Sequence, residues 1–226
     1  SFKWQHFAPS EVRIDPSISN IIEMFVVTKT FYNNMLEYKN GVVSVKPEPP
    51  TSDQLGQDLA TLDNYKSLSD QIVYSSGKFK LLFGSDADVE VQAQIKVVKL
   101  PNATSSDTEI RSAVLQLIDA YFNINNWDFG ETFYFSELSA YIHQELGGQV
   151  ATVVIVPSKA ESNFGDLYQV RCEPDELFMS TATVDNIEVV KSLTSVNLKQ
   201  STAPVSGKTS TSSTSTSSGS SSSSSG

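Results

Sequence analysis

Residues 125–138 read Asn-Asn-Trp-Asp-Phe-Gly-Glu-Thr-Phe-Tyr-Phe-Ser-Glu-Leu, and they form the most informative segment of the chain. Aromatic residues are too dense here for an ordinary solvated loop, because leaving large apolar rings in water costs free energy. We predict a loop that runs into a helix capped by Ser136 and ended by Gly147. The apolar run 150–156 then predicts a strand.

The aromatic residues of this segment have two compatible interpretations. They can cover the core between two helices, or some of them can form a contact between subunits, since aromatic residues are favoured at the centres of interfaces. The residues that we predict at such a subunit interface are Trp127, Phe129 and Tyr134.

Two capping boxes predict helix starts upstream of this segment. Thr51-Ser52-Asp53-Gln54 and Ser106-Asp107-Thr108-Glu109 each place a hydroxyl three residues before a side chain that can bond back to the cap. Apolar residues at helical spacing follow both boxes. These stripes are Leu55, Leu59, Leu62 and Tyr65 in the first helix, and Ile110, Val114, Leu117, Ile118 and Tyr121 in the second.

The first part of the chain predicts a strand that feeds directly into a helix. An opening strand at 2–7 is followed by a turn at 13–20 and a mostly buried strand at 21–27. A helix at 29–38 comes next, and Gly41 ends it. A strand leading into a helix is half of a β-α-β unit.

Later strands complete the prediction. Residues 89–97 alternate strictly between apolar and polar, which indicates one wet face and an antiparallel or edge position. Phe79, Leu81 and Phe83 also alternate with polar neighbours. We expect 150–156 and 168–172 to pair with each other, and 186–190 to form a short last strand. The predicted fold class is α+β, a mixed β-sheet with flanking helices in β-α-β-like units.

The predicted domain covers residues 1–200, with possible internal boundaries near 46–51 and 100–106. Residues 201–226 are rich in Ser, Thr and Gly and carry no side chain that could anchor a core. We therefore expect a disordered tail. The chain begins without methionine, and we expect it to be processed or to be a piece of something longer.

The charge and hydropathy patterns argue against two classes of partner. The formal net charge is −10 and the 16 Lys and Arg residues are scattered, so we expect no nucleic-acid partner. No apolar run approaches the ~20 residues of a membrane helix, and no signal peptide is recognisable before the first strand. We therefore expect no membrane partner.

No catalytic, cofactor or metal site is predicted. Cys172 is the single cysteine, so no intramolecular disulfide forms, and its surroundings favour a small buried residue over a nucleophile. A catalytic thiol would need a histidine, and only His6, read as a strand residue, and His143, on a polar helix face, exist. The acidic residues after 172 favour a surface turn.

Asp86, Asp88 and Glu90 have the spacing of the first ligands in a calcium loop. A full loop also needs glycine at its sixth position and glutamate at its twelfth, and the chain has Val91 and Val97 there. A solvated strand edge explains these acids better than a metal site does.

Three parts of the sequence resemble one protein family. They are Phe2-Lys3-Trp4-Gln5-His6-Phe7 with 13–22, the helix 109–122 leading into Trp127-Asp128-Phe129-Gly130-Glu131, and Phe135-Ser136-Glu137-Leu138 with Ile142 and the strand 150–156. On these residues, over roughly 1–190, the chain resembles the baseplate wedge proteins of T4-type contractile-tailed phages, in the baseplate J-type superfamily. Members of this family are considerably longer, so the resemblance is to their C-terminal part. The Ser-rich tail departs from the family pattern.

The resemblance implies a structural role. It implies a non-enzymatic late protein of the virion, in the tail baseplate, assembled in the cytoplasm of the bacterial host. Such a subunit links neighbouring wedges by protein–protein contact, forms a homodimer and binds other wedge proteins without a cofactor. Two other classes stay open: a soluble ligand-binding module of a cellular protein, and a cryptic hydrolase using His6, Cys172 or the carboxylates.

Overall fold

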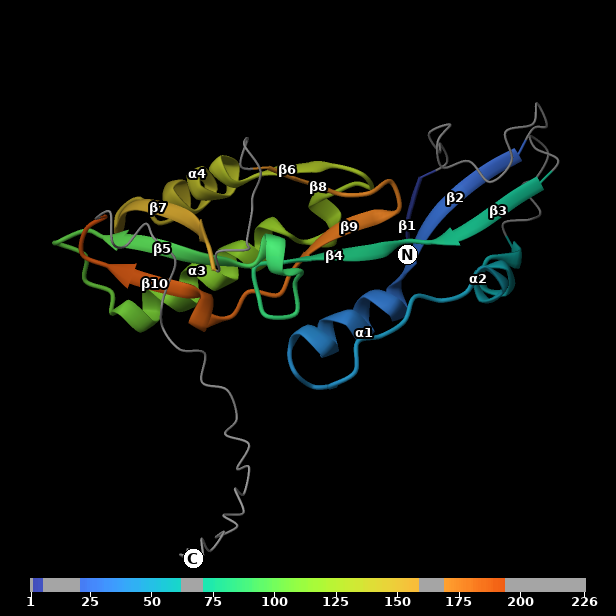
Figure 1. Cartoon of the computed structure of the whole chain (residues 1–226), viewed down its shortest axis with the longest axis horizontal. Coiled ribbons are helices and arrows are strands. Elements are labelled where there is room, and N and C mark those ends of the chain that lie inside the picture. The colour runs from blue at the N-terminus through green and yellow to red at the C-terminus, as the bar shows by residue number, and fades with distance from the viewer. Residues whose placement is uncertain (1, 6–20, 62–70, 159–168, 194–226) are drawn as a thin grey trace, which may run out of the picture.

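The computed structural model describes residues 2–5, 21–61, 71–158 and 169–193 (Figure 1). The helices are α1 (Lys29–Lys39), α2 (Ser52–Asp58), α3 (Asp107–Tyr121) and α4 (Phe135–Glu145). The strands are β1 (Phe2–Gln5), β2 (Ile21–Thr28), β3 (Gln71–Ser76), β4 (Lys78–Leu82), β5 (Ala93–Lys99), β6 (Thr132–Tyr134), β7 (Val150–Pro157), β8 (Gln169–Arg171), β9 (Glu176–Ser180) and β10 (Ile187–Val190). This content confirms the α+β class.

One end of the molecule is a three-stranded sheet in the order β1-β2-β3. β2 and β3 are parallel, and α1 and α2 lie between them in sequence, which completes the β-α-β unit. The predicted capping box at Thr51 is present, but α2 ends at Asp58. A small cluster of Val26, Leu55 and Tyr74 fixes α2 against the sheet.

A single residue, Gly77, separates β3 from β4, so the two strands form one continuous run along the long axis of the molecule (Figure 1). β4 pairs in parallel with β9 in the middle of the molecule. Two ion pairs lie where this pairing begins. Lys78 Nζ lies 2.8 Å from Asp175 Oδ2, and Lys80 Nζ lies 3.4 Å from Glu176 Oε2.

The other end is a sheet in the order β10-β5-β7, with α3 packed against β10 and α4 against β7 (Figure 1). The prediction for 89–97 is confirmed in its antiparallel pairing, with β7, but was wrong in two other respects. Val89–Val91 is a 3-10 turn, and β5 is a central strand, parallel to β10 and antiparallel to β7. Lys96, on the face that was expected to be wet, is buried. Its charge is compensated by an ion pair with Glu188 of β10, with Nζ and Oε2 3.2 Å apart.

Three strands, β3, β6 and β9, were missed, and one pairing was wrong. The strand at 150–156 pairs with β5, not with 168–172. β8, which is the described part of the strand predicted at 168–172, pairs instead with β6, which lies inside the predicted aromatic loop. Of β9, only Glu176 was considered, as part of a surface turn. The three missed strands have little alternation of their own, so their partners, far away in sequence, determine them.

The cap of α4 also differs from the prediction. Tyr134 occupies the N-cap position with no side-chain hydrogen bond, and Ser136 lies in the first turn. Phe135 is buried at the helix start, so burial of its ring, instead of a hydroxyl cap, defines the entry into α4. By contrast, Ser106 caps α3 in the predicted capping box.

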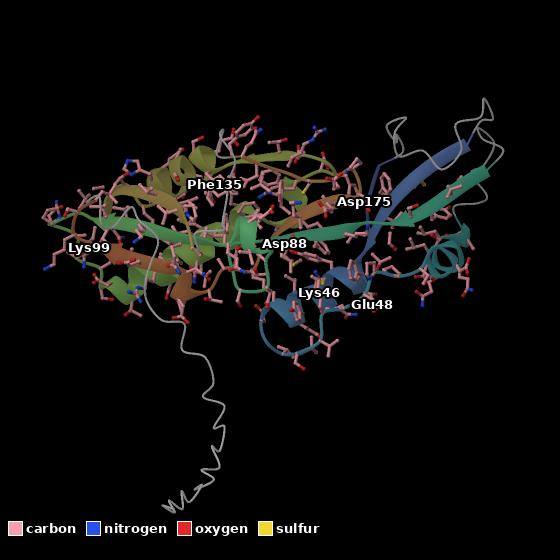
Figure 2. All side chains as sticks on the ribbon, viewed as in Figure 1. Lys46, Glu48, Asp88, Lys99, Phe135 and Asp175 are labelled. Atoms are coloured by element: carbon pink, nitrogen blue, oxygen red, sulfur yellow. The ribbon has the colours of Figure 1, made fainter. Side chains whose placement is uncertain are left out.

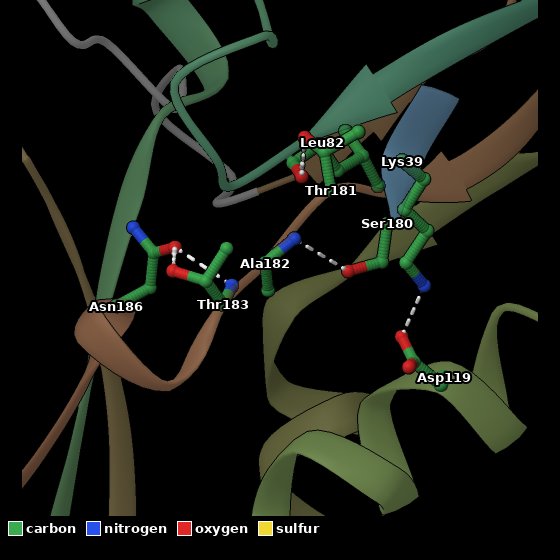
Figure 3. Close-up of polar contacts among 8 residues, drawn as sticks. All are labelled: Lys39, Leu82, Asp119, Ser180, Thr181, Ala182, Thr183 and Asn186. Carbon is green, nitrogen blue, oxygen red and sulfur yellow. Dashed lines mark hydrogen bonds and ion pairs between the residues drawn. The ribbon is translucent and has the colours of Figure 1, made fainter. Parts of the chain in front are cut away.

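Polar contacts near the middle of the molecule connect α1 with α3 and the end of β4 with the residue after β9 (Figure 3). Lys39 of α1 contacts Asp119 of α3 at 2.5 Å between Nζ and Oδ1. The hydroxyl of Thr181 donates to the carbonyl of Leu82 at 3.1 Å, which continues the pairing of β4 and β9 beyond their ends. The main hydrophobic core runs through this region without a break, from Phe31 in α1 to Ile187 in β10.

Several predictions fall outside the described residues: His6, the turn at 13–20, Leu62 and Tyr65 of the stripe that begins at Leu55, and the tail at 201–226.

Candidate interaction surface

Trp127 belongs to the core of this chain. Its side chain is 8% exposed. The indole stacks on Phe122 with ring centroids 5.6 Å apart, and it meets Phe178 edge-on at 4.9 Å. Its N–H donates to the carbonyl oxygen of Tyr121 at 2.9 Å, so the buried polar atom has a partner. The predicted packing role is confirmed for this residue.

Phe129 is also buried, at the point where β3 becomes β4. Its ring lies 6.2 Å from that of Phe25 on β2 and directly against Gly77. The next residue, Gly130, has φ of +72°, a left-handed conformation that glycine adopts without steric strain. This turn directs the ring toward the N-terminal sheet. Phe129 therefore connects the aromatic segment to a distant part of the chain.

Tyr134 is the exposed member of the three predicted interface residues. It lies on β6 next to the fully buried Phe133, and the alternation of the strand turns its ring outward, where it is 41% exposed. Contact with a partner through these residues stays a prediction. Among the three, Tyr134 is the residue whose ring is largely available, because Trp127 and Phe129 are occupied by this chain.

A shallow hollow of about 510 Å³ lies beside the aromatic segment. The half-buried residues Tyr121 and Tyr141 line it with Trp127, together with Glu131 and Glu137. Burial, and then the charge and hydrogen bond of Glu137, raise the pKa of Tyr121 to about 12. The hydroxyl of Tyr121 thus stays protonated and donates to Glu137.

A second surface, which sequence reasoning missed, is the connection between α1 and α2. Val42 and Val45 are 71% and 77% exposed there, and Val43 is 36% exposed. We call residues 42–45 the valine loop. The sequence could have indicated this surface. Three valines lie between Gly41 and Pro47, and so short a loop cannot turn all of them toward a core.

The valine loop leads into a cleft of about 360 Å³. Phe31 and Met35 of α1 and Phe79 and Leu81 of β4 form its apolar lining, and the Phe31 and Phe79 rings are in contact, with centroids 5.6 Å apart. Charged side chains of both signs border it: Lys46, Lys78, Lys80, Asp86, Asp88 and Glu176. Figure 2 shows Lys46 and Asp88 on the two sides of this region, on the segment after α1 and on the segment after β4.

The described groups that were considered for catalysis are Cys172, His143 and the carboxylates after residue 172. Cys172 is buried after β8, as predicted, and burial raises the pKa of its thiol well above the ordinary value. His143 is exposed in the last turn of α4. Asp175 and Glu176 form ion pairs with lysines of β4. Among the described residues, no three His, Cys, Asp or Glu side chains gather closely enough to hold a metal ion.

Within the described part of the chain, every helix is too short or too polar to cross a membrane. In comparisons with known proteins, neither a protein-family model nor a curated protein matches this sequence.

Proposed function

We propose that this chain is a non-enzymatic structural subunit that works by protein–protein contact. More specifically, we propose a baseplate wedge subunit of a contractile phage tail, which forms a homodimer and links neighbouring wedges in the virion. The specific part rests on the resemblance of the three sequence segments. The general part rests on the surface of the molecule.

The exposed valine loop is the observation that carries the proposal. Val42 and Val45 each leave more than two thirds of their surface in water, next to a cleft whose interior is apolar. Clustered exposed apolar side chains at a concave surface are typical of protein contact sites, since covering them releases about 25 cal/mol per Å². Nothing in the fold of the loop requires valine for packing.

The relation of loop and cleft favours contact between two copies. Lys46 and Pro47 line the cleft and directly follow the valine loop in sequence, so the two features are adjacent. In a two-fold dimer each surface patch meets itself, so the loop of one copy can cover the cleft of the other, and the reverse. One contact then buries both apolar features.

Sedimentation velocity over a range of protein concentrations tests this proposal. We expect the full chain to self-associate, and we expect the double variant V42S/V45S to sediment as a monomer with unchanged unfolding midpoint. V184S is the matched control, because Val184 is also exposed but lies on another segment. A native chain that stays monomeric at its highest soluble concentration would contradict the dimer.

A ligand-binding module is the second candidate, and the volume of the cleft favours it. About 360 Å³ lies within the usual range for small-molecule sites. This interpretation predicts a monomer whose unfolding temperature rises when a small molecule is bound. Self-association that depends on the valine loop argues for the assembly role instead.

A further inference from the structure

The hollow beside the aromatic segment has an aromatic floor built from three separate elements. The ring of Tyr121 on α3 lies 5.6 Å from Trp127 and 5.4 Å from Tyr141 on α4. Trp127 is held in place by its stacking on Phe122 and its hydrogen bond to the backbone. The floor is therefore preorganised by the core beneath it.

Two carboxylates border this floor, and both are oriented by hydrogen bonds. Oε2 of Glu131 accepts from the N–H of Asp128 at 2.8 Å, and Glu137 accepts from the hydroxyl of Tyr121. Both side chains are exposed, and no ion pair joins either one to another described residue. Each carboxylate keeps a second oxygen for a ligand.

We infer that this hollow binds the guanidinium group of an arginine side chain on a partner protein. A planar cation can lie on the faces of Tyr and Trp rings while its N–H groups reach carboxylate oxygens at the edge. Tyr121 and Tyr141 supply the rings, and Glu131 and Glu137 supply the charge. A neutral apolar group would cover two carboxylates without compensation, which costs free energy.

An arginine suits the hollow better than a lysine does. The ammonium group of lysine is compact and strongly hydrated, so it loses more hydration on an aromatic floor. The guanidinium group is more weakly hydrated, and its fork of N–H donors can engage both carboxylates at once. The inference rests on the proposed role in protein contact, but it concerns a surface separate from the valine loop.

Titration of the ¹⁵N-labelled full chain with short peptides tests the inference, with the indole N–H signal of Trp127 as the readout. The probe is the blocked peptide Gly-Arg-Gly. Its controls are the same peptide with lysine, and with citrulline, which keeps the shape of arginine but has no charge. We expect a saturable shift with arginine, a weaker one with lysine and none with citrulline. Added salt should weaken the binding.

Variants locate the site. E131Q/E137Q keeps an oxygen for the bonds from Asp128 and Tyr121 but removes both charges, so the fold should be retained while affinity for the arginine peptide falls roughly tenfold or more. E145Q, on the outer part of α4, removes a matched exposed charge and should leave affinity unchanged.

Three results would overturn the inference: equal shifts with arginine and citrulline, no saturable shift with arginine, or equal losses in E145Q and E131Q/E137Q. None of them bears on the valine loop. If self-association is lost in V42S/V45S but the arginine peptide causes no saturable shift, the assembly role is supported and only the arginine site is rejected.

Discussion

Phe129 and Gly77 are in direct contact, although one belongs to the aromatic segment and the other to the junction of β3 and β4. A Cβ atom added to Gly77 would lie 2.7 Å from Cε1 of the Phe129 ring and equally close to Cγ2 of Val27. The ring thus occupies the space that any other residue at 77 would need. The absence of a side chain at Gly77 is what allows the aromatic segment to reach the N-terminal sheet.

Replacing Gly77 by alanine should destabilise the protein. The added methyl group meets two buried side chains, and we expect the free energy of unfolding to fall by about 1–3 kcal/mol. Urea denaturation measures the change. Gly56 in α2 is the matched control, because a Cβ there meets nothing within 4 Å. G56A should be neutral or stabilising by up to about 1 kcal/mol, and equal losses in the two variants would contradict this account.

The two serines near helix starts should behave differently. Ser106 accepts a hydrogen bond from the N–H of Glu109 at 3.2 Å, so S106A should cost about 1 kcal/mol of stability. Ser136 lies in the first turn of α4 without a capping role, so S136A should change stability by less than about 0.5 kcal/mol. Thermal or urea unfolding of both variants checks this. The reverse order would show that Ser136 caps α4 after all.

Removing the charge of the buried Lys96 should destabilise the protein less than removing the charge of its partner, Glu188. Lys96 lies opposite Glu188 of β10 and is 3% exposed. E188Q leaves the ammonium group poorly compensated, and we expect a loss of about 1–2 kcal/mol. K96M keeps the aliphatic part and should stay within about 1 kcal/mol of the native chain.

Urea unfolding of K96M, E188Q and the double variant tests this pair. In the K96M background, E188Q should cost nothing further, since the charge it compensates is gone. An undiminished cost there would mean that Glu188 acts through another group.

Stability should fall in alkaline solution because of Cys172. Burial, and then the charge of Glu176, raise the pKa of its thiol in the folded chain. In the unfolded chain the thiol ionises near its ordinary pKa of about 8.5, so its contribution is complete below that pH and is lost as pH rises toward the folded value. The loss can reach about 1.4 kcal/mol per pH unit.

Unfolding free energies measured from pH 7 to pH 10 check the sign and the residue. C172A should show a flatter pH profile than the native chain. Tyr121, whose pKa is raised to about 12, adds a similar loss only above its ordinary pKa of about 10. An identical slope in C172A would assign the alkaline loss to other groups.

Local signals in the sequence predicted the local structure well. Both capping boxes lie where they were predicted, since each depends on residues three positions apart. The stripe on α3 is confirmed by the burial of Ile110, Val114 and Ile118, because helical spacing alone places them on one face. Burial of Trp127 likewise follows from aromatic density.

Strand partners and exposed surface could not be predicted in the same way. The alternation at 89–97 indicated a wet face. Lys96 is buried instead because Glu188 compensates its charge, and nothing in the sequence around Glu188 indicates that it pairs with a residue so far away in the chain. β9 has four consecutive buried residues and no alternation at all. The hollow at Tyr121 needs residues from two helices and a loop, and only the folded chain brings them together.

The pairing of β4 with β9 has a consequence for how the chain reaches its native state. The Thr181 hydroxyl donates to the carbonyl of Leu82, which lies 99 residues earlier in the sequence. β5 likewise pairs with β10, which lies near the end of the described residues. Contacts so distant in sequence form only after long loops close, which places folding among the slower, millisecond-to-second class. During synthesis, β4 stays without its partner until almost the whole described chain has emerged from the ribosome.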